Sequence, residues 1–298
     1  MKGSHTTEPQ MRYWQPAPAL RALVSGYHLY RIGSSVGEPQ TDAFQPAGAI
    51  LRFTLGKPGN WCVQPPRGSW QAVPPVALFG PSSGITWSRS GPGQTIGVGI
   101  LPRGWARLSR VPASEWTDRV AEPGEALRID TTALARALEA AADDDDAIPA
   151  ILDAALVAAM PWPSRNEDVI AAFEEALLER GISKVEELAR RIGRPRHTTE
   201  RLAKRIFGFP PKLLIRRARF LRSLHALGEC GANSPSGSAR AIDYGYTDYS
   251  HFIRDAHGFL GMSPQAFLKM DNPLLRQSLA LRKKVLGAPA QALARGRD

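Results

Sequence analysis

Two stretches in the C-terminal part of the chain share one plan: an amphipathic segment, a glycine, and a second amphipathic segment. They are centred on Gly193 and Gly245. In the first stretch, Ser183 with Glu186 three residues later predicts the start of a helix, and Pro195 predicts the start of the next one. A helix, a tight glycine turn and a second helix form a helix–turn–helix motif. The repeated plan therefore predicts an all-α region with two such units.

The second helix of each unit is expected to present a polar face. RHTTERLAKRIF buries Thr199, Leu202 and Ile206 on one face and leaves a basic face exposed. In the second unit we expect Ser238 to cap the helix SARAIDY and Asp248 to cap the helix after the glycine. A single unit of this kind is as compatible with a solvated basic surface as with DNA binding. Two units in one chain favour DNA binding.

The segment PPKLLIRRARFLRSLHALG lies between the units and predicts one continuous helix. About 17 residues at 1.5 Å each span roughly 25 Å. With the width of the flanking units, this approaches the length of one DNA turn, about 34 Å. One chain would then read two successive major grooves.

The charge distribution supports a polyanionic partner for this region. Residues 1–164 hold 14 Lys and Arg against 14 Asp and Glu, whereas residues 165–298 hold 24 against 14, so the whole net charge of +10 lies in the second part. Nucleic acid is the first candidate for such a partner, and an anionic membrane surface is the second. No apolar run is long enough for a membrane span. Cys62 and Cys230 are expected to be structural thiols, so the cytoplasm is the expected compartment, and no membrane partner is predicted.

Two longer segments carry a resemblance to a known family. FGFPPKLLIRRARFLRSL and IDYGYTDYSHFIRDAHGFLGMSP closely resemble the DNA-binding domain of the AraC/XylS family of bacterial transcription regulators, here over residues 165–271. The resemblance implies double-stranded DNA as partner, with RNA polymerase and a second copy of the chain as further partners. The family usually has Phe where Ala203 and Ala256 stand, which leaves the tilt of both recognition helices open.

The resemblance also implies which residues contact DNA. The base contacts carried over to this chain are His197, Glu200, Arg201, Tyr249, Ser250, Ile253 and Arg254. The phosphate contacts are Arg196, Lys204 and Arg205. Because arginine bonded to guanine through two hydrogen bonds is the commonest specific contact, we expect Arg201 and Arg254 to contribute most to specificity.

The N-terminal part, residues 11–130, has a different pattern. AILRFTL, VALF and TIGVGIL predict strands, and Gly/Pro-rich turns separate them. ALRALVSGYHLY adds a helix or a strand. The fold class is therefore α+β with two domains, and the resemblance implies a cupin-like β domain that senses a small-molecule effector or dimerises. Trp61, Trp70, Trp87 and Trp105 either line a pocket or belong to the core; the ligand-binding residues stay unknown.

The remaining segments connect and end these domains. Residues 131–164 predict a helical linker region, in which Asp143–Asp146 form a solvated loop because they lack the alternation and the glycine of a calcium loop. Residues 272–298 form a basic tail, in which LLRQSLALRKKVLG is either a helix or part of a disordered extension.

Catalysis is not expected. Ser250 and His251 are adjacent on a helix, so their side chains diverge by about 100°. Gly80–Gly84 fits G-x-S-x-G, but no helical pattern follows. We predict no catalytic residue, no metal site and no cofactor, because histidines are scarce before residue 197. Two alternatives stay open: a small-molecule-binding β-barrel enzyme with a basic helical tether, and a scaffold that binds an acidic protein.

Overall fold

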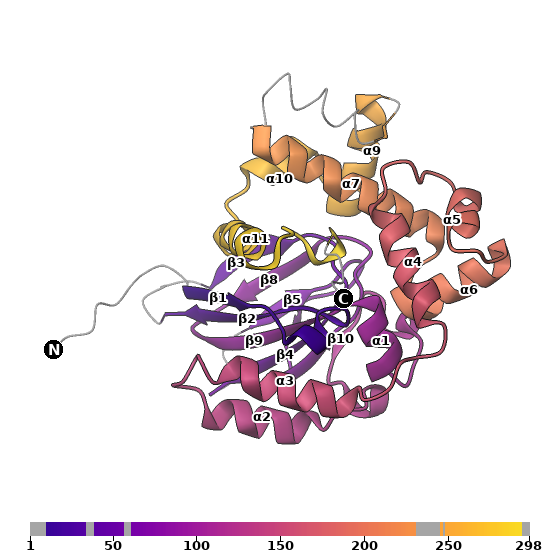
Figure 1. Cartoon of the computed structure of the whole chain (residues 1–298). Helices are drawn as coiled ribbons and strands as arrows, with labels where there is room; N and C mark the ends of the chain where they lie inside the picture. The colour runs from indigo at the N-terminus through magenta and orange to yellow at the C-terminus, as the bar shows by residue number, and fades with distance from the viewer. Residues whose placement is uncertain (1–9, 34–38, 57–60, 231–244, 247, 294–298) are drawn as a thin grey trace.

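Two antiparallel sheets and a set of helices make up the chain, as the computed structural model shows (Figure 1). It describes residues 10–33, 39–56, 61–230, 245–246 and 248–293. The strands are β1 (Gln10–Trp14), β2 (Val24–Ile32), β3 (Gln40–Phe44), β4 (Ala49–Leu55), β5 (Cys62–Gln64), β6 (Gln71–Ala72), β7 (Val76–Phe79), β8 (Thr86–Ser90), β9 (Gly93–Ile100) and β10 (Val120–Ala121). The α-helices are α1 (Pro102–Leu108), α2 (Thr131–Ala140), α3 (Ile148–Ala159), α4 (Glu167–Leu178), α5 (Val185–Arg191), α6 (Arg196–Phe207), α7 (Pro211–Cys230), α9 (Tyr249–Leu260), α10 (Pro264–Lys269) and α11 (Pro273–Leu286).

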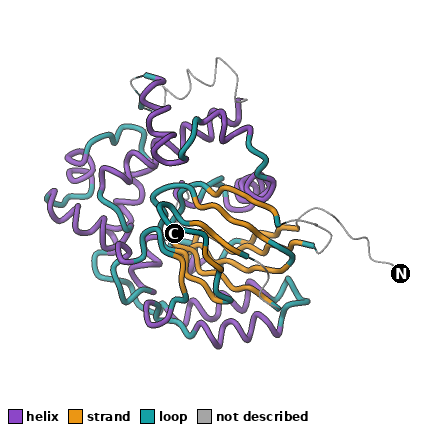
Figure 2. Tube along the Cα trace, turned by 180° about the vertical axis from the view of Figure 1, so that it is seen from behind, coloured by secondary structure: helices purple, strands orange, loops and turns teal. Residues whose placement is uncertain are grey.

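The predicted α+β organisation with a β-rich N-terminal part and a helical C-terminal part is confirmed. One sheet has the order β1-β2-β9-β4-β7-β10 and the other the order β3-β8-β5-β6. β4 and β7 have the bounds that the sequence predicts, and the segment ALRALVSGYHLY forms a short 3₁₀ turn followed by β2. In Figure 2 the sheets lie to one side of the C-terminal helices.

The outer face of the six-stranded sheet packs against α2 and α3. Leu51, Val98 and Tyr27 from the sheet share one buried cluster with Leu138 and Leu152 from the two helices. The helices therefore complete the core of the β domain, and residues 131–164 do not form a separate linker region as predicted. The physical reason is their apolar stripe, which must be buried against another element. The acidic loop between them is also anchored, because Asp145 pairs with Arg31 at 2.6 Å.

The inner face of the same sheet carries a polar row. Strand register places Tyr13, His28, Gly97, Arg52 and Ala77 side by side across five strands. A Cβ at Gly97 would lie 2.1 Å from the His28 ring, so that ring lies directly over the glycine. This face is turned toward the four-stranded sheet. The interior between the two sheets is therefore not purely apolar.

The tail returns to the β domain. The helical alternative is the one found: α11 packs against β1 and β3, as Figure 1 also shows, and 3₁₀ turn η4 (Gln291–Leu293) follows. Ser278 contacts the hydroxyls of Tyr13 and Tyr30 at 2.6 and 3.0 Å, all three side chains being buried. Asp42 of β3 accepts hydrogen bonds from the first free amides of α11, so a strand of the β domain caps this helix. Among the described helices, none is long and apolar enough to cross a membrane.

Candidate nucleic-acid interface and ligand pocket

The first helix–turn–helix unit consists of α5, a turn at Gly193 and α6. Gly193 has a φ of +63°, which is why a glycine occupies the turn. The capping carboxylate is Glu187 rather than the predicted Glu186: it accepts from the amides of Ser183 and Lys184 at 2.8 and 2.9 Å. The helix starts one residue later than expected, so the third helical position moves by one as well.

The polar face of α6 is the one that the sequence predicts. The exposed residues are Arg196, His197, Arg201, Lys204 and Arg205. Glu200 is half-buried and pairs with Arg196 at 3.0 Å, while Arg196 also pairs with Glu186 at 2.7 Å. On the opposite face Thr199 and Ala203 are fully buried. The Arg196–Glu200 pair thus holds one predicted phosphate contact beside one predicted base contact.

The small Ala203 is accommodated by large neighbours. It belongs to a buried cluster in which the rings of Phe173 and Phe207 stack with centroids 4.4 Å apart. Ala256 of α9 similarly lies in a cluster with Phe220, whose ring stacks on Phe259 at 5.1 Å. Aromatic rings from α4 and α7 therefore belong to the clusters in which the small Ala203 and Ala256 are buried.

The second unit is described from Gly245 onward, and its predicted first helix with Ser238 lies outside the described residues. Gly245 has a φ of +93°. Asp248 caps α9 as predicted, since its carboxylate accepts from the amide of His251 at 2.7 Å. The His251 ring packs edge-on against Tyr246 with centroids 5.7 Å apart, so it serves helix packing.

Along α9 the predicted contact residues differ in exposure. Ser250 and Arg254 are exposed, and Ile253 is half-buried. Tyr249 is half-buried too, because its ring packs near Phe252 and its hydroxyl accepts a hydrogen bond from Gln265 of α10. Ser250, Ile253 and Arg254 thus lie at the start of a capped helix, whereas Tyr249 is tied to the helical core.

Sequence reasoning missed the buried carboxylate that fastens α9 to α7. Asp255 is 1% exposed and accepts hydrogen bonds from Arg216 at 2.5 Å and from the Tyr246 hydroxyl at 2.8 Å. Arg219 adds a longer ion pair at 3.4 Å and stacks over the Tyr246 ring. The available signal was an aspartate on the apolar stripe of α9 facing two arginines spaced by three residues on α7.

A basic groove of about 510 Å³ lies beside α6, between this helix and the start of α4. Arg201 and Arg205 line it together with Arg165 and Arg194. Four guanidinium groups around one groove create a strongly positive surface next to the recognition helix. Arg201 and Arg205 were predicted to contact DNA, whereas Arg165 and Arg194 lie outside the helix RHTTERLAKRIF and were not predicted.

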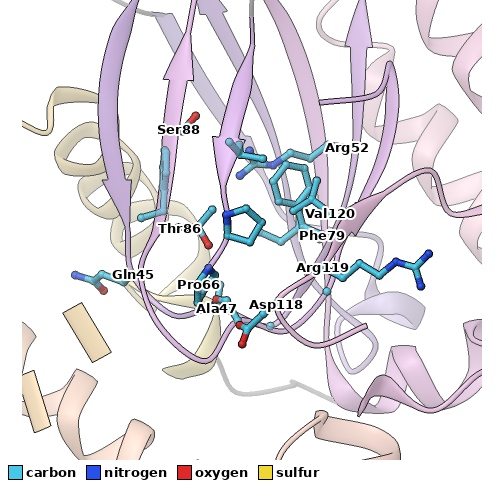
Figure 3. Close-up of a pocket in the computed structure, with 17 residues that line it drawn as sticks. Gln45, Ala47, Arg52, Pro66, Phe79, Thr86, Ser88, Asp118, Arg119 and Val120 are labelled. Carbon is cyan, nitrogen blue, oxygen red and sulfur yellow. Dashed lines mark hydrogen bonds between the residues drawn. The ribbon is translucent and has the colours of Figure 1, made fainter. Parts of the chain in front are cut away.

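A second candidate site lies between the two sheets. Figure 3 shows this pocket, which has a volume of about 50 Å³ and whose lining comes from both sheets and the loops that join them. Ile50, Arg52 and Phe79 come from the six-stranded sheet, and Val63 and Ser88 from the other. Among the four tryptophans considered, Trp61 lies beside Arg52, Trp105 is in the core, Trp87 is partly buried and Trp70 is exposed.

The floor of this pocket contacts the helical domain. Arg217 of α7 donates hydrogen bonds to the carbonyls of Ala47 and Ser82, at 3.4 and 3.1 Å. Both residues also line the pocket. Burial lowers the pKa of Arg217 to about 10. The amide of Ile85 donates to the carbonyl of Phe259 in α9 at 2.9 Å.

The G-x-S-x-G segment lies in the same floor. It forms the loop between β7 and β8, with no helix after the serine, as the sequence predicts. The Ser82 hydroxyl accepts from the amide of Ala47, and Ser83 donates to Asp118 through both its amide and its hydroxyl at 2.6 Å. The loop therefore joins the pocket to α7.

This geometry defines a helix–turn–helix DNA-binding protein. Residues 188–270 match the family model described as a helix-turn-helix domain. The match covers the first unit from α5 onward and the second unit, so it identifies the C-terminal part of the chain as a helix-turn-helix domain, in agreement with the resemblance to AraC-type DNA-binding domains. A comparison with the curated proteins found no match.

Several solved structures resemble the whole chain distantly. ToxT from Vibrio cholerae bound to an unsaturated fatty acid is 10% identical, with 91% of this chain and 98% of that chain covered and a TM-score of 0.44. ToxT bound to (E)-4-(8-methylnaphthalen-1-yl)but-3-enoic acid is 9% identical, with 87% and 98% covered and a TM-score of 0.45. The AraC-like transcriptional activator CuxR is 13% identical, with 72% and 86% covered and a TM-score of 0.23. At these scores the likeness carries no conclusion about this chain's ligand.

Proposed function

We propose that this protein is a transcription regulator that reads two successive major grooves with α6 and α9. The proposed base contacts are His197, Glu200, Arg201, Tyr249, Ser250, Ile253 and Arg254, and the proposed phosphate contacts are Arg196, Lys204 and Arg205. The observation that carries the proposal is the exposure of Arg201 and Arg254, which occupy the same position in α6 and α9. An arginine that reads guanine contributes about 1–3 kcal/mol of discrimination.

The test is retention of genomic fragments by the purified protein at about 150 mM salt, where non-specific contacts weaken. We expect a few fragments that share a motif. Arg201→Ala and Arg254→Ala should relax the motif at different positions, whereas Lys204→Ala should weaken all fragments alike. Arg276→Ala on α11 is the matched control, because Arg276 is exposed but lies outside both units. Equal losses on cognate and random DNA for Arg254→Ala would exclude a base-reading role.

We further propose that a small molecule bound between the sheets controls DNA binding. The pocket floor supports this, since Arg217 links the Ala47 and Ser82 carbonyls to the helix that joins the two units. A ligand that shifts this loop would shift α7 relative to the β domain. The ToxT structures contain bound organic acids, but the proposal depends on the pocket of this chain and not on that distant likeness.

Ligand control is tested by repeating fragment retention with and without a low-molecular-weight extract of the source cells. We expect the extract to change retention by wild-type protein. Arg217→Met removes the hydrogen bonds to the pocket floor and should abolish that change while leaving retention itself intact. A response that survives in Arg217→Met would show that control takes another route.

A further inference from the structure

The interior of the β domain contains a buried cation, Arg52, that is not paired with a carboxylate of the described part of the chain. The Arg52 side chain is 8% exposed, and its Nε has no hydrogen-bond partner. Among the residues that the structure describes, no carboxylate forms an ion pair with it. Burying an unpaired guanidinium costs folding free energy, which a chain tolerates where the charge has a use.

Aromatic rings surround this guanidinium. Its central carbon lies 4.6 Å from the ring centroid of Phe79, 5.3 Å from that of Trp61 and 6.0 Å from that of Phe44. Such rings stabilise a cation through their π faces. They accept no ordinary hydrogen bonds, so the planar N–H groups of Arg52 still lack the bidentate acceptor that suits them best.

Pockets lie on both sides of the guanidinium. The pocket of about 50 Å³ described above and a second pocket of about 40 Å³ share Phe44, Arg52 and Ser88 in their linings. Beyond these residues the first pocket is lined mainly by apolar side chains, including Ile50 and Val63. An engineered cavity that admits benzene is about 150 Å³. A bulky ligand would therefore have to displace Phe44, whereas a slender one needs less movement.

The two carboxylates of this region already have other partners. Asp118, which also lines the first pocket, accepts hydrogen bonds from Ser83, and the buried Asp42 accepts from the amides of Leu274 and Leu275. His28 lies over Gly97, next to Arg52 in the cross-strand row, and burial together with Arg52 and Arg282 lowers its pKa well below the usual value. It is therefore neutral at pH 7. Arg282 of α11, stacked over Tyr13, is a further buried cation. Among the described residues, Arg52 therefore has no counter-ion of its own.

Resting on the proposed control by a small molecule, we propose that the ligand is an organic monocarboxylate. Its carboxylate pairs with Arg52 through two hydrogen bonds, and its apolar body lies against Phe44, Ile50 and Phe79. A charged head alone would leave the apolar lining unused, and a neutral molecule would leave Arg52 unpaired. An apolar acid satisfies both parts of the site.

The experiment uses full-length protein and the probes butanoate, hexanoate and benzoate, each beside its primary amide, with sulfate and phosphate as inorganic anions. Thermal unfolding and tryptophan fluorescence, to which Trp61 beside Arg52 contributes, report binding. We expect at least one of the three acids to raise the melting temperature and change the fluorescence, while amides and inorganic anions do not. A response to none of the three acids at millimolar concentration overturns the inference, as does an equal response to acids and amides.

Arg52→Met tests the role of the charge. It should weaken acid binding by at least about 30-fold, as expected for removing one partner of a desolvated charge pair. It should also raise the melting temperature of the unliganded protein, a gain that an arginine with a purely structural role would not give. Arg89→Met is the matched control, because Arg89 is exposed on β8 and stacks on Trp70. Undiminished acid binding by Arg52→Met would overturn the inference.

The two proposals fail separately. If the amides bind wild-type protein and Arg52→Met equally and still alter fragment retention, ligand control stands and the carboxylate assignment falls. If acids bind through Arg52 but retention does not change, the site is correctly assigned and control by the ligand falls.

Discussion

Replacing Asp255 with asparagine should loosen α9, the helix that follows the turn of the second unit. Asp255 is 1% exposed, and its carboxylate contacts Arg216, Arg219 and Tyr246 at 2.5, 3.4 and 2.8 Å. Asparagine has nearly the same shape, so Asp255→Asn removes the charge without opening a cavity. Two arginines then lose their buried anion.

The expected loss of stability in Asp255→Asn follows from the burial of the ion pair. Removing one partner of a buried ion pair typically costs about 3–5 kcal/mol. The Arg216 side chain is 41% exposed and can be partly rehydrated, so we expect the lower end, about 3 kcal/mol. The pair between Glu229 and Lys283 is the matched control: it measures 2.6 Å, but both side chains are more than half exposed. Glu229→Gln should cost only about 0–1 kcal/mol.

Amide hydrogen exchange along α9 measures this difference, because it reports the free energy of local opening. In Asp255→Asn, the amides of α9 should exchange about 100-fold faster than in wild-type protein, as about 3 kcal/mol requires. Amides of β4 and β9 should be unaffected. If Asp255→Asn and Glu229→Gln changed α9 exchange by the same factor, the carboxylate would not be what fastens this helix to α7.

Three further outcomes are expected. Burial lowers the pKa of His225 to about 4, so the unfolded chain takes up a proton that the native state excludes. Stability should therefore fall by about 2 kcal/mol between pH 7 and pH 5, and urea titrations of His225→Leu should show a smaller fall if this sign is right. Gly97→Ala places a methyl group against the His28 ring and should cost about 1–3 kcal/mol in urea unfolding, whereas Gly258→Ala, in open space on α9, should not destabilise. Deleting residues 271–298 uncovers Tyr13 and Tyr30, so the melting temperature should drop and a hydrophobic dye should bind; an unchanged melting temperature would mean that α11 does not support the β domain.

Local sequence patterns predicted the bounds of helices and strands well. They did not predict which helices and strands pack against one another. The bounds of β4 and β7 are those of the segments AILRFTL and VALF that predicted them, because each segment is a short apolar run with a clear end. What α2 and α3 cover, and the return of α11 to β1, depend on contacts between residues far apart in the sequence, such as Tyr27 with Asp153 and Tyr13 with Ser278. No local pattern encodes such contacts.

Buried charged residues were also visible in the sequence, whereas their partners were not. Arg52 stands in the middle of the apolar run AILRFTL, where period-two alternation places it on the opposite face from Leu51 and Phe53. The strand pattern does not tell which of the two faces belongs to the core and which lines a pocket. Only the position of the second sheet decides this. In the sequence, Asp255 is likewise only one polar residue on a helix. Its role becomes clear when the structure places the arginines of α7 beside it.

The arginines of α7 connect the two sites. Residues three apart on a helix share a face, and adjacent residues point about 100° apart. Arg216 and Arg219 accordingly face Asp255 of α9, whereas Arg217 faces the Ala47 and Ser82 carbonyls at the pocket floor. A rigid helix with both contacts cannot move at the pocket without moving α9 as well. If ligand control takes this route, Asp255→Asn and Arg217→Met should each abolish the response of DNA retention to the ligand. Asp255→Asn would abolish the response by loosening α9, whereas Arg217→Met would abolish it with α9 still firmly packed. The rate of amide hydrogen exchange along α9 distinguishes the two cases.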